Sequence, residues 1–261
     1  MNQPQSPDLS SLSSQFQGLA ENLTHEWGFF VVRTAYTADV DKESWTAALE
    51  NLHRYVKAGD DAAEIHPSTL ALPVIADRSA LNGIDYASIR NAFTGWLGEF
   101  LHHKRPLDDD GNEDWPSDVR RDVFIVIDDP SLASLLNAPE PVRGRSPNLD
   151  PEPWVIVVDS EDPDTVPYRG GGPYMGFMRA RACALGQLFE DLGSRSMGRV
   201  CPVREYEGQI PLYDGSLRGK LIDGDFAAGA RYRFPRGTPR GADGAMKPTF
   251  GASSGRHPQA G

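Results

Sequence analysis

The sequence predicts an α+β fold, in which a small mixed sheet of three to four strands is covered by helices. Short, nearly continuous apolar runs are typical of strands that helices cover, and longer segments between them carry apolar residues at helical spacing. The strands are few, and helices or long loops separate them along the chain. The predicted strands span residues 29–36, 123–128 and 154–159, while the pattern of 174–180 fits either a strand or the start of a helix.

Helices are predicted where leucine and aromatic residues recur every three or four positions. The first lies in the amphipathic N-terminal segment, where Ser6, Pro7 and Asp8 supply the residue types that favour a helix start. Trp45 and Trp96 are predicted to be buried anchors of two longer helices. After the first helix, the predicted helical segments are 41–58, 85–105, 129–136 and 182–192.

Composition divides the chain into a body and a tail. Residues 1–24 are predicted to form the N-terminal helix, 25–225 a single α+β domain, and 226–261 a disordered, basic, Gly/Pro-rich tail. Between residues 231 and 261 the tail carries six basic side chains and one acid, although the formal net charge of the whole chain is −11. The body is therefore strongly acidic, and such a surface repels nucleic acid and anionic membranes.

The predicted location is the cytoplasm. No apolar run approaches the roughly 20 residues of a membrane-spanning helix, and the first residues lack the basic and apolar regions of a secretory signal. The two cysteines, Cys183 and Cys201, are too few for a disulfide scaffold and are expected to be reduced thiols. We predict no membrane partner, and nucleic acid only as a partner of the tail. The identity of a protein partner stays open.

Three charged residues in or at the ends of predicted strands are the candidate catalytic residues. Arg33 falls inside an otherwise apolar strand, and a buried guanidinium needs a partner. Asp128 and Asp159 each close an apolar run, so neighbouring strands would place both carboxylates near one sheet edge. We expect a structural ion pair between Arg33 and one aspartate. Ligand binding or catalysis by these residues stays open, as does a role of either aspartate in capping the segment that follows it.

A glycine-rich loop after the third predicted strand is the candidate cofactor-binding segment. It comprises Arg169, Gly170, Gly171 and Gly172. Backbone N–H groups of such loops bind anions, and Arg169 adds a positive charge. The loop lacks the Lys-Ser/Thr pair of a P-loop and the glycine spacing of a dinucleotide-binding loop. A turn without a ligand is therefore the favoured interpretation.

Two further segments match a metal-binding or a nucleophile motif in some residue types but lack other features that the motif requires. The acidic run 108–114 begins with calcium-ligand spacing, but Glu113 and Val119 replace the glycine and the bidentate glutamate that such a loop requires. Gly251–Gly255 matches the G-x-S-x-G motif but lies in the tail, without the strand and helix that position the serine. The sequence therefore predicts no metal and no cofactor.

The string Trp27–Thr37 resembles the opening of a family of uncharacterised ascomycete proteins. The similarity continues through Ser88–Phe93, Val126–Asp129 and Gly176–Met178, so it touches most of residues 27–193. Proteins of this kind are commonly described as hypothetical, without an assigned activity. The resemblance implies a fungal source and a strand rather than a helix at 174–180, and it supplies no catalytic residues.

The favoured function is that of a non-catalytic cytosolic α+β interaction module, because no nucleophile, metal set or cofactor loop has the context it requires. One alternative is a small-molecule enzyme or anionic-ligand binder that uses Arg33 with Asp128 or Asp159. A second alternative is that the basic tail, residues 231–261, binds RNA or an acidic protein.

Overall fold

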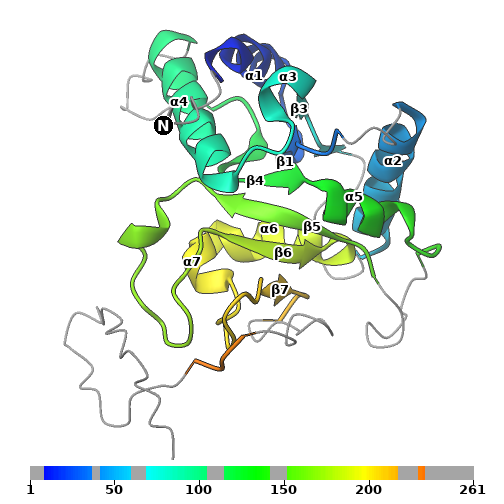
Figure 1. Cartoon of the computed structure of the whole chain (residues 1–261). Helices are drawn as coiled ribbons and strands as arrows, with labels where there is room; N and C mark the ends of the chain where they lie inside the picture. Colours follow the sequence, from blue (N-terminus) through cyan, green and yellow to red (C-terminus); the bar gives the residue numbers. More distant parts are fainter. Residues whose placement is uncertain are drawn as a thin grey trace, which may run out of the picture.

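The computed structural model of the chain describes residues 9–36, 42–59, 69–104, 115–141, 152–216 and 229–232. Within these residues seven strands form one mixed sheet (Figure 1). The strands are β1 Trp27–Arg33, β2 Leu70–Ala71, β3 Val74–Ala76, β4 Asp118–Ile127, β5 Trp154–Asp159, β6 Phe177–Arg181 and β7 Leu212–Tyr213. Their order is β2-β1-β4-β5-β6-β7, and β3 also pairs with β1.

Strand direction divides the sheet into two parts. β1 runs parallel to β2, β3 and β4, so the carboxyl ends of these strands share one edge. The β4–β5 and β5–β6 pairs are antiparallel, and β7 runs parallel to β6. The residues that follow β4 and β5 therefore lie at opposite edges of the sheet.

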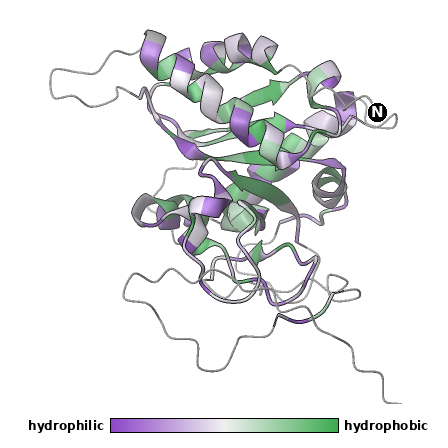
Figure 2. Cartoon of the chain, turned by 60° about the vertical axis from the view of Figure 1, so that its left-hand side comes forward, coloured by the Kyte–Doolittle hydropathy of each residue, from purple (hydrophilic) through white to green (hydrophobic). Residues whose placement is uncertain are grey.

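Helices cover both faces of this sheet (Figure 1). The α-helices are α1 Ser13–Glu21, α2 Lys42–Ala58, α3 Arg78–Leu81, α4 Tyr86–Lys104, α5 Asp129–Leu136, α6 Leu185–Ser194 and α7 Met197–Val200. One core cluster joins α1, α3 and α4 to one face, and the other joins α2, α5, α6 and α7 to the opposite face. Figure 2 shows the hydrophobic residues concentrated in the strands between these helical layers. Short 3-10 turns span Ser10–Leu12, Pro163–Thr165 and Ala182–Ala184.

The sequence prediction of a mixed sheet under helices is confirmed, but the predicted size of three to four strands is wrong. β2, β3 and β7 have two or three residues each, too few to show an apolar run or an alternation. β4 begins earlier than expected, inside a polar segment. There the guanidinium of Arg120 donates two hydrogen bonds to the carboxylate of Asp122, from Nε at 2.7 Å and from Nη2 at 2.5 Å.

Several local predictions are confirmed. Residues 174–180 contain the first four residues of β6, so the strand interpretation of this segment is the correct one. Trp45 and Trp96 are buried, and the indole N–H of Trp96 donates to the carbonyl oxygen of Leu9 at 3.2 Å. That bond ties the N-terminal segment to α4.

Other predictions fall outside the described residues. These are the helix start at Ser6–Asp8, the acidic run 108–114, the motif Gly251–Gly255 and most of the tail 226–261. Of the tail, residues 229–232 are described, and they lie against the body. Arg231 forms an isolated antiparallel β-bridge with Tyr206, and the backbone N–H of Tyr232 donates to the carbonyl oxygen of Glu205 at 2.8 Å. No helix in the described part combines the length and the hydropathy needed to cross a bilayer.

Candidate functional site

Arg33 ends β1, and its guanidinium lies between two aromatic rings. Its Cζ atom is 4.5 Å from the ring centroid of Tyr36 and 4.5 Å from that of Trp45. Its Nε donates at 3.0 Å to the backbone carbonyl two residues ahead. Among the described residues, no carboxylate oxygen lies within 4.0 Å of this guanidinium. The expected ion pair with Asp128 or Asp159 is therefore not formed, and cation–π contacts stabilise the charge instead.

The two candidate aspartates follow neighbouring strands, but the structure keeps them apart. β4 and β5 are antiparallel, and Asp159 is opposite Val123, so Asp128 lies five residues further along the β4 strand direction. This offset separates the two residues by roughly 16 Å along the sheet. They therefore do not form a paired-carboxylate site.

Asp128 caps the start of α5. Its Oδ1 accepts hydrogen bonds from the backbone N–H of Ser131 at 2.9 Å and from the Ser131 hydroxyl at 2.6 Å. Its Oδ2 accepts a hydrogen bond from the Tyr86 hydroxyl at 2.6 Å. Burial and the adjacent carboxylate raise the pKa of Tyr86, so the phenol remains a donor. The geometry of Asp128 is that of a helix cap.

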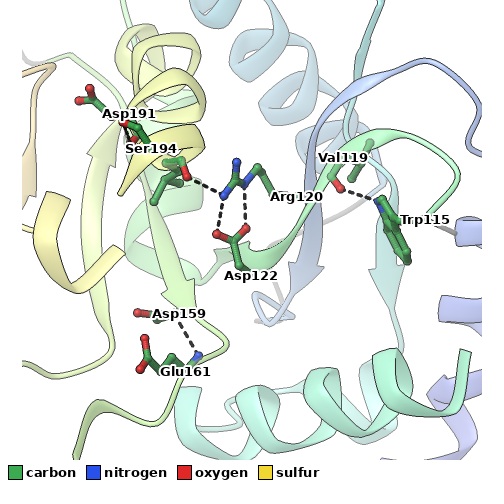
Figure 3. A network of polar contacts seen from close by, with 9 residues as sticks. Trp115, Val119, Arg120, Asp122, Asp159, Glu161, Asp191 and Ser194 are labelled. Carbon is green, nitrogen blue, oxygen red and sulfur yellow. Dashed lines mark hydrogen bonds and ion pairs between the residues drawn. The ribbon is translucent and has the colours of Figure 1, made fainter. Parts of the chain in front are cut away.

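Asp159 is buried at the end of β5, where the loop 160–176 begins (Figure 3). Its carboxylate accepts hydrogen bonds from the Tyr174 hydroxyl at 2.7 Å and from the backbone N–H of Glu161 at 3.0 Å. Burial raises the pKa of Asp159, and the acids Glu161 and Asp122 add to the rise, while the two hydrogen bonds oppose it. Tyr174 connects this carboxylate to a cavity.

That cavity has a volume of about 320 Å³ and lies between the loop 160–176 and the segment that follows α7, the loop 201–211. In Figure 1 the loop 160–176 runs beside α7. Proline, tyrosine and valine side chains form much of its wall, together with Met175 and Phe177. Ligand sites in proteins are typically about 300–1,000 Å³ with mostly apolar walls. The lining residues are Pro163–Gly170, Gly172–Met175, Phe177, Gly198, Cys201–Arg204 and Pro211.

Arg90 of α4 holds the two ends of the loop 160–176 together. This buried arginine donates from Nε to the carbonyl oxygen of Asp159 at 2.8 Å. Its Nη2 donates to the carbonyl oxygens of Gly176 at 3.1 Å and Met175 at 3.4 Å. Gly176 has φ +73°, and a Cβ there would lie 2.2 Å from Arg90 Nη2. Glycine is therefore required where the loop meets the arginine.

The two loops also bind each other. The backbone N–H of Gly172 donates to the carbonyl oxygen of Arg204 at 2.8 Å, and Arg204 Nη1 donates to the carbonyl oxygen of Pro173 at 3.1 Å. Gly171 has φ +69°, and a Cβ there would lie 2.2 Å from the same Arg204 oxygen. The loops approach so closely that a side chain at this position does not fit.

The glycine-rich segment predicted from the sequence thus lines the cavity through Arg169, Gly170 and Gly172. Its donors are partly used within the protein. Arg169 Nη1 donates to the carbonyl oxygens of Gly198 at 2.8 Å and Arg199 at 2.5 Å, at the end of α7. These contacts hold the segment against α7.

The Cys201 thiol and the Tyr174 hydroxyl in the cavity wall are protonated near neutral pH. Burial raises the pKa of the Cys201 thiol to about 12, and the charges of Arg169 and Arg204 oppose this rise. Burial and the negative charge of Asp159 raise the pKa of Tyr174 well above its ordinary value. A thiol in this form is a poor nucleophile, so Cys201 is unreactive near neutral pH.

A second, more polar hollow shares residues 166–169 with this cavity. Its lining includes Arg195, Ser196 and Arg199, and it is bounded by α7. In the described part of the chain, no group of three or more His, Cys, Asp or Glu side chains is placed to hold a metal ion.

Comparisons with known proteins give no relative: no protein-family model, no curated protein and no solved structure matches this chain. The resemblance to ascomycete proteins therefore stays a prediction.

Sequence reasoning did not single out the residues that build this site, namely Arg90, Tyr174, Cys201 and Arg204. For Arg90 a signal was present, because this arginine lies next to Ile89 in the apolar pattern of α4. The other three residues lie in segments without hydrophobic periodicity. In such segments the sequence does not indicate which side chains contact each other.

Proposed function

We propose that the protein binds a small, largely apolar organic molecule in the cavity between the loops 160–176 and 201–211, without transforming it. The observation that carries this proposal is the cavity itself, with its volume of about 320 Å³ and its wall of proline, tyrosine and valine side chains. A wall of this kind binds ligands through burial of apolar surface.

The fixed backbone of the loops supports binding. Arg90 joins both ends of the loop 160–176 to α4, and Gly172 and Arg204 join the two loops to each other. A cavity whose walls are held in place does not have to be ordered when a ligand enters. Preorganisation of this kind lowers the entropic cost of binding.

The chemistry of the wall supports binding rather than catalysis. Burial raises the pKa of the Cys201 thiol to about 12, and the Tyr174 hydroxyl donates a hydrogen bond to the Asp159 carboxylate. Neither group is in a form that attacks a substrate or accepts a proton near neutral pH. The proposal therefore agrees with the sequence interpretation that the protein is non-catalytic. It differs in that the proposed binding partner is a small molecule.

We also keep the cytoplasmic location as a proposal. Both cysteines are free thiols in the structure, as expected for a protein from a reducing compartment.

Blocking the cavity tests the proposed function. Val203 lines the cavity and is 37% exposed, so a Val203→Trp variant is expected to fold normally and to place its indole over the cavity. The neutral fluorophore N-phenyl-1-naphthylamine, which brightens in apolar surroundings, serves as the probe. We expect wild-type protein to bind it, and Val203→Trp to weaken binding about tenfold through lost apolar contact.

The matched control is Leu136→Trp. Leu136, on α5, is 38% exposed and does not line the cavity. This variant adds the same indole elsewhere and is expected to bind the probe like wild type. Absence of probe binding by wild-type protein, or equal weakening in both variants, would exclude the cavity as the binding site.

A further inference from the structure

We propose that the ligand of this cavity carries an oxyanion, a carboxylate or a phosphate, which binds the guanidinium of Arg204. This inference rests on the proposed function, because it names the chemical class of the molecule that the cavity takes. It assigns the polar end of an otherwise apolar ligand to one side chain of the wall.

The hydrogen bonds of Arg204 leave donors unused at the cavity. A guanidinium has five N–H groups. Nη1 donates to the carbonyl oxygen of Pro173 at 3.1 Å, and Nη2 donates to the Tyr232 hydroxyl at 3.2 Å. Nε is buried and has no hydrogen-bond partner. Nε itself is enclosed by protein, so a ligand in the cavity meets the second N–H of Nη1 and of Nη2, and an oxyanion accepts charge-assisted hydrogen bonds from these groups.

The charge of Arg204 is also uncompensated by a neighbouring acid. Within the described ranges, no carboxylate oxygen lies within 4.0 Å of its guanidinium. The adjacent Glu205 pairs with Arg231 at 3.0 Å, and the Asp159 carboxylate accepts from Tyr174. The acid in the lining, Asp164, is exposed. A negative ligand would therefore meet an arginine whose charge is still available.

A second arginine strengthens the positive potential of the wall. Arg169 lines the same cavity from the other loop. Both arginines act on the Cys201 thiol, since their charges oppose the rise of its pKa. The cavity is thus apolar along most of its wall and positive where the two loops meet.

Tyr232 holds Arg204 in this position. Its ring centroid is 5.5 Å from Arg204 Cζ, and its hydroxyl accepts the Nη2 hydrogen bond. Tyr232 belongs to residues 229–232, which pair with the backbone of residues 205–207. We regard Tyr232 as a positioning residue, because it acts on the ligand through the arginine.

The test compares two probes on the full-length chain. N-phenyl-1-naphthylamine is neutral, and 8-anilinonaphthalene-1-sulfonate has the same ring system with one anionic group. We expect the sulfonate probe to bind wild-type protein about tenfold more tightly, as expected for a hydrogen bond to a charged group. Arg204→Gln is expected to remove this preference, so that the two probes bind this variant with about equal affinity. Arg204→Lys keeps the charge and is expected to restore part of the preference.

Arg199→Gln is the matched control, because Arg199 is an exposed arginine of the second hollow. It is expected to leave the preference unchanged. Loss of the preference in Arg199→Gln, or its survival in a folded Arg204→Gln variant, would overturn the inference. Equal affinity of both probes for wild-type protein would overturn it too, while leaving the proposed function intact. Binding of neither probe would overturn both proposals.

The kind of oxyanion is distinguished by displacement of the sulfonate probe. Displacement by 1-naphthoate at lower concentration than by 1-naphthyl phosphate assigns a carboxylate, and the reverse order assigns a phosphate. Displacement by neither compound at concentrations that saturate an arginine site would contradict an oxyanion ligand.

Discussion

An Arg90→Met variant is expected to lose about 3 kcal/mol of unfolding free energy, because three carbonyl oxygens at the two ends of the loop 160–176 lose a charged donor at once. Two of these bonds, to Asp159 and Gly176, are 2.8 and 3.1 Å long and involve a side chain that is 7% exposed. Methionine fills similar volume but donates no hydrogen bond. The loop 160–176 is therefore expected to lose its attachment to α4, and the neutral probe to bind at least about tenfold more weakly.

Urea denaturation and probe titration measure the two effects. The control is Arg54→Met, since Arg54 forms an exposed ion pair with Glu140 and is expected to contribute at most about 1 kcal/mol. Wild-type stability and wild-type probe affinity in Arg90→Met would show that the hydrogen bonds of Arg90 are not needed to hold the loop 160–176.

A Phe93→Ala variant is expected to lose about 3–5 kcal/mol of unfolding free energy, because it leaves a cavity among packed rings. Phe93 is fully buried, stacks on Phe124 at 4.5 Å and meets the rings of Phe16 at 5.4 Å and Phe30 at 5.8 Å. The substitution removes packing contacts between α4 and three other elements, because these rings belong to β4, α1 and β1. Thermal and urea denaturation measure it.

Phe93→Leu keeps most of the volume and is expected to cost less than about 2 kcal/mol. At temperatures where Phe93→Ala is folded, its probe affinity should equal that of wild type, since Phe93 does not line the cavity. A stability equal to wild type in Phe93→Ala would show that α4 does not anchor this core.

The fold could be predicted where burial imposes a pattern. β1, β4 and β5 are covered by helices on both faces, so their apolar runs are nearly continuous and identify them as strands. β2 and β7 have two residues each, and their pairing depends on neighbours that are distant in the chain. No local pattern marks such strands, and the sheet was therefore predicted too small.

The candidate site could be predicted only in part. Asp159 and the segment Arg169–Gly172 were candidates, and the structure brings both to the cavity region through Tyr174 and the loop 160–176. Arg33 and Asp128 were candidates because they interrupt or end apolar runs. The same observation fits an arginine between aromatic rings and a helix cap, and sequence alone does not distinguish these uses from ligand binding.

Protection of the cavity thiol tests the central claim most directly. Cys201 lines the cavity and Cys183 does not, yet burial raises the pKa of each thiol to about 12. Both should therefore react slowly with iodoacetamide at neutral pH, and each rate should rise about tenfold for every unit by which the pH is raised, up to that pKa. Peptide mass spectrometry reports the two rates separately. With N-phenyl-1-naphthylamine at saturation, we predict slower alkylation of Cys201 alone; unchanged alkylation of Cys201, or equal slowing of both thiols, would contradict binding in the cavity.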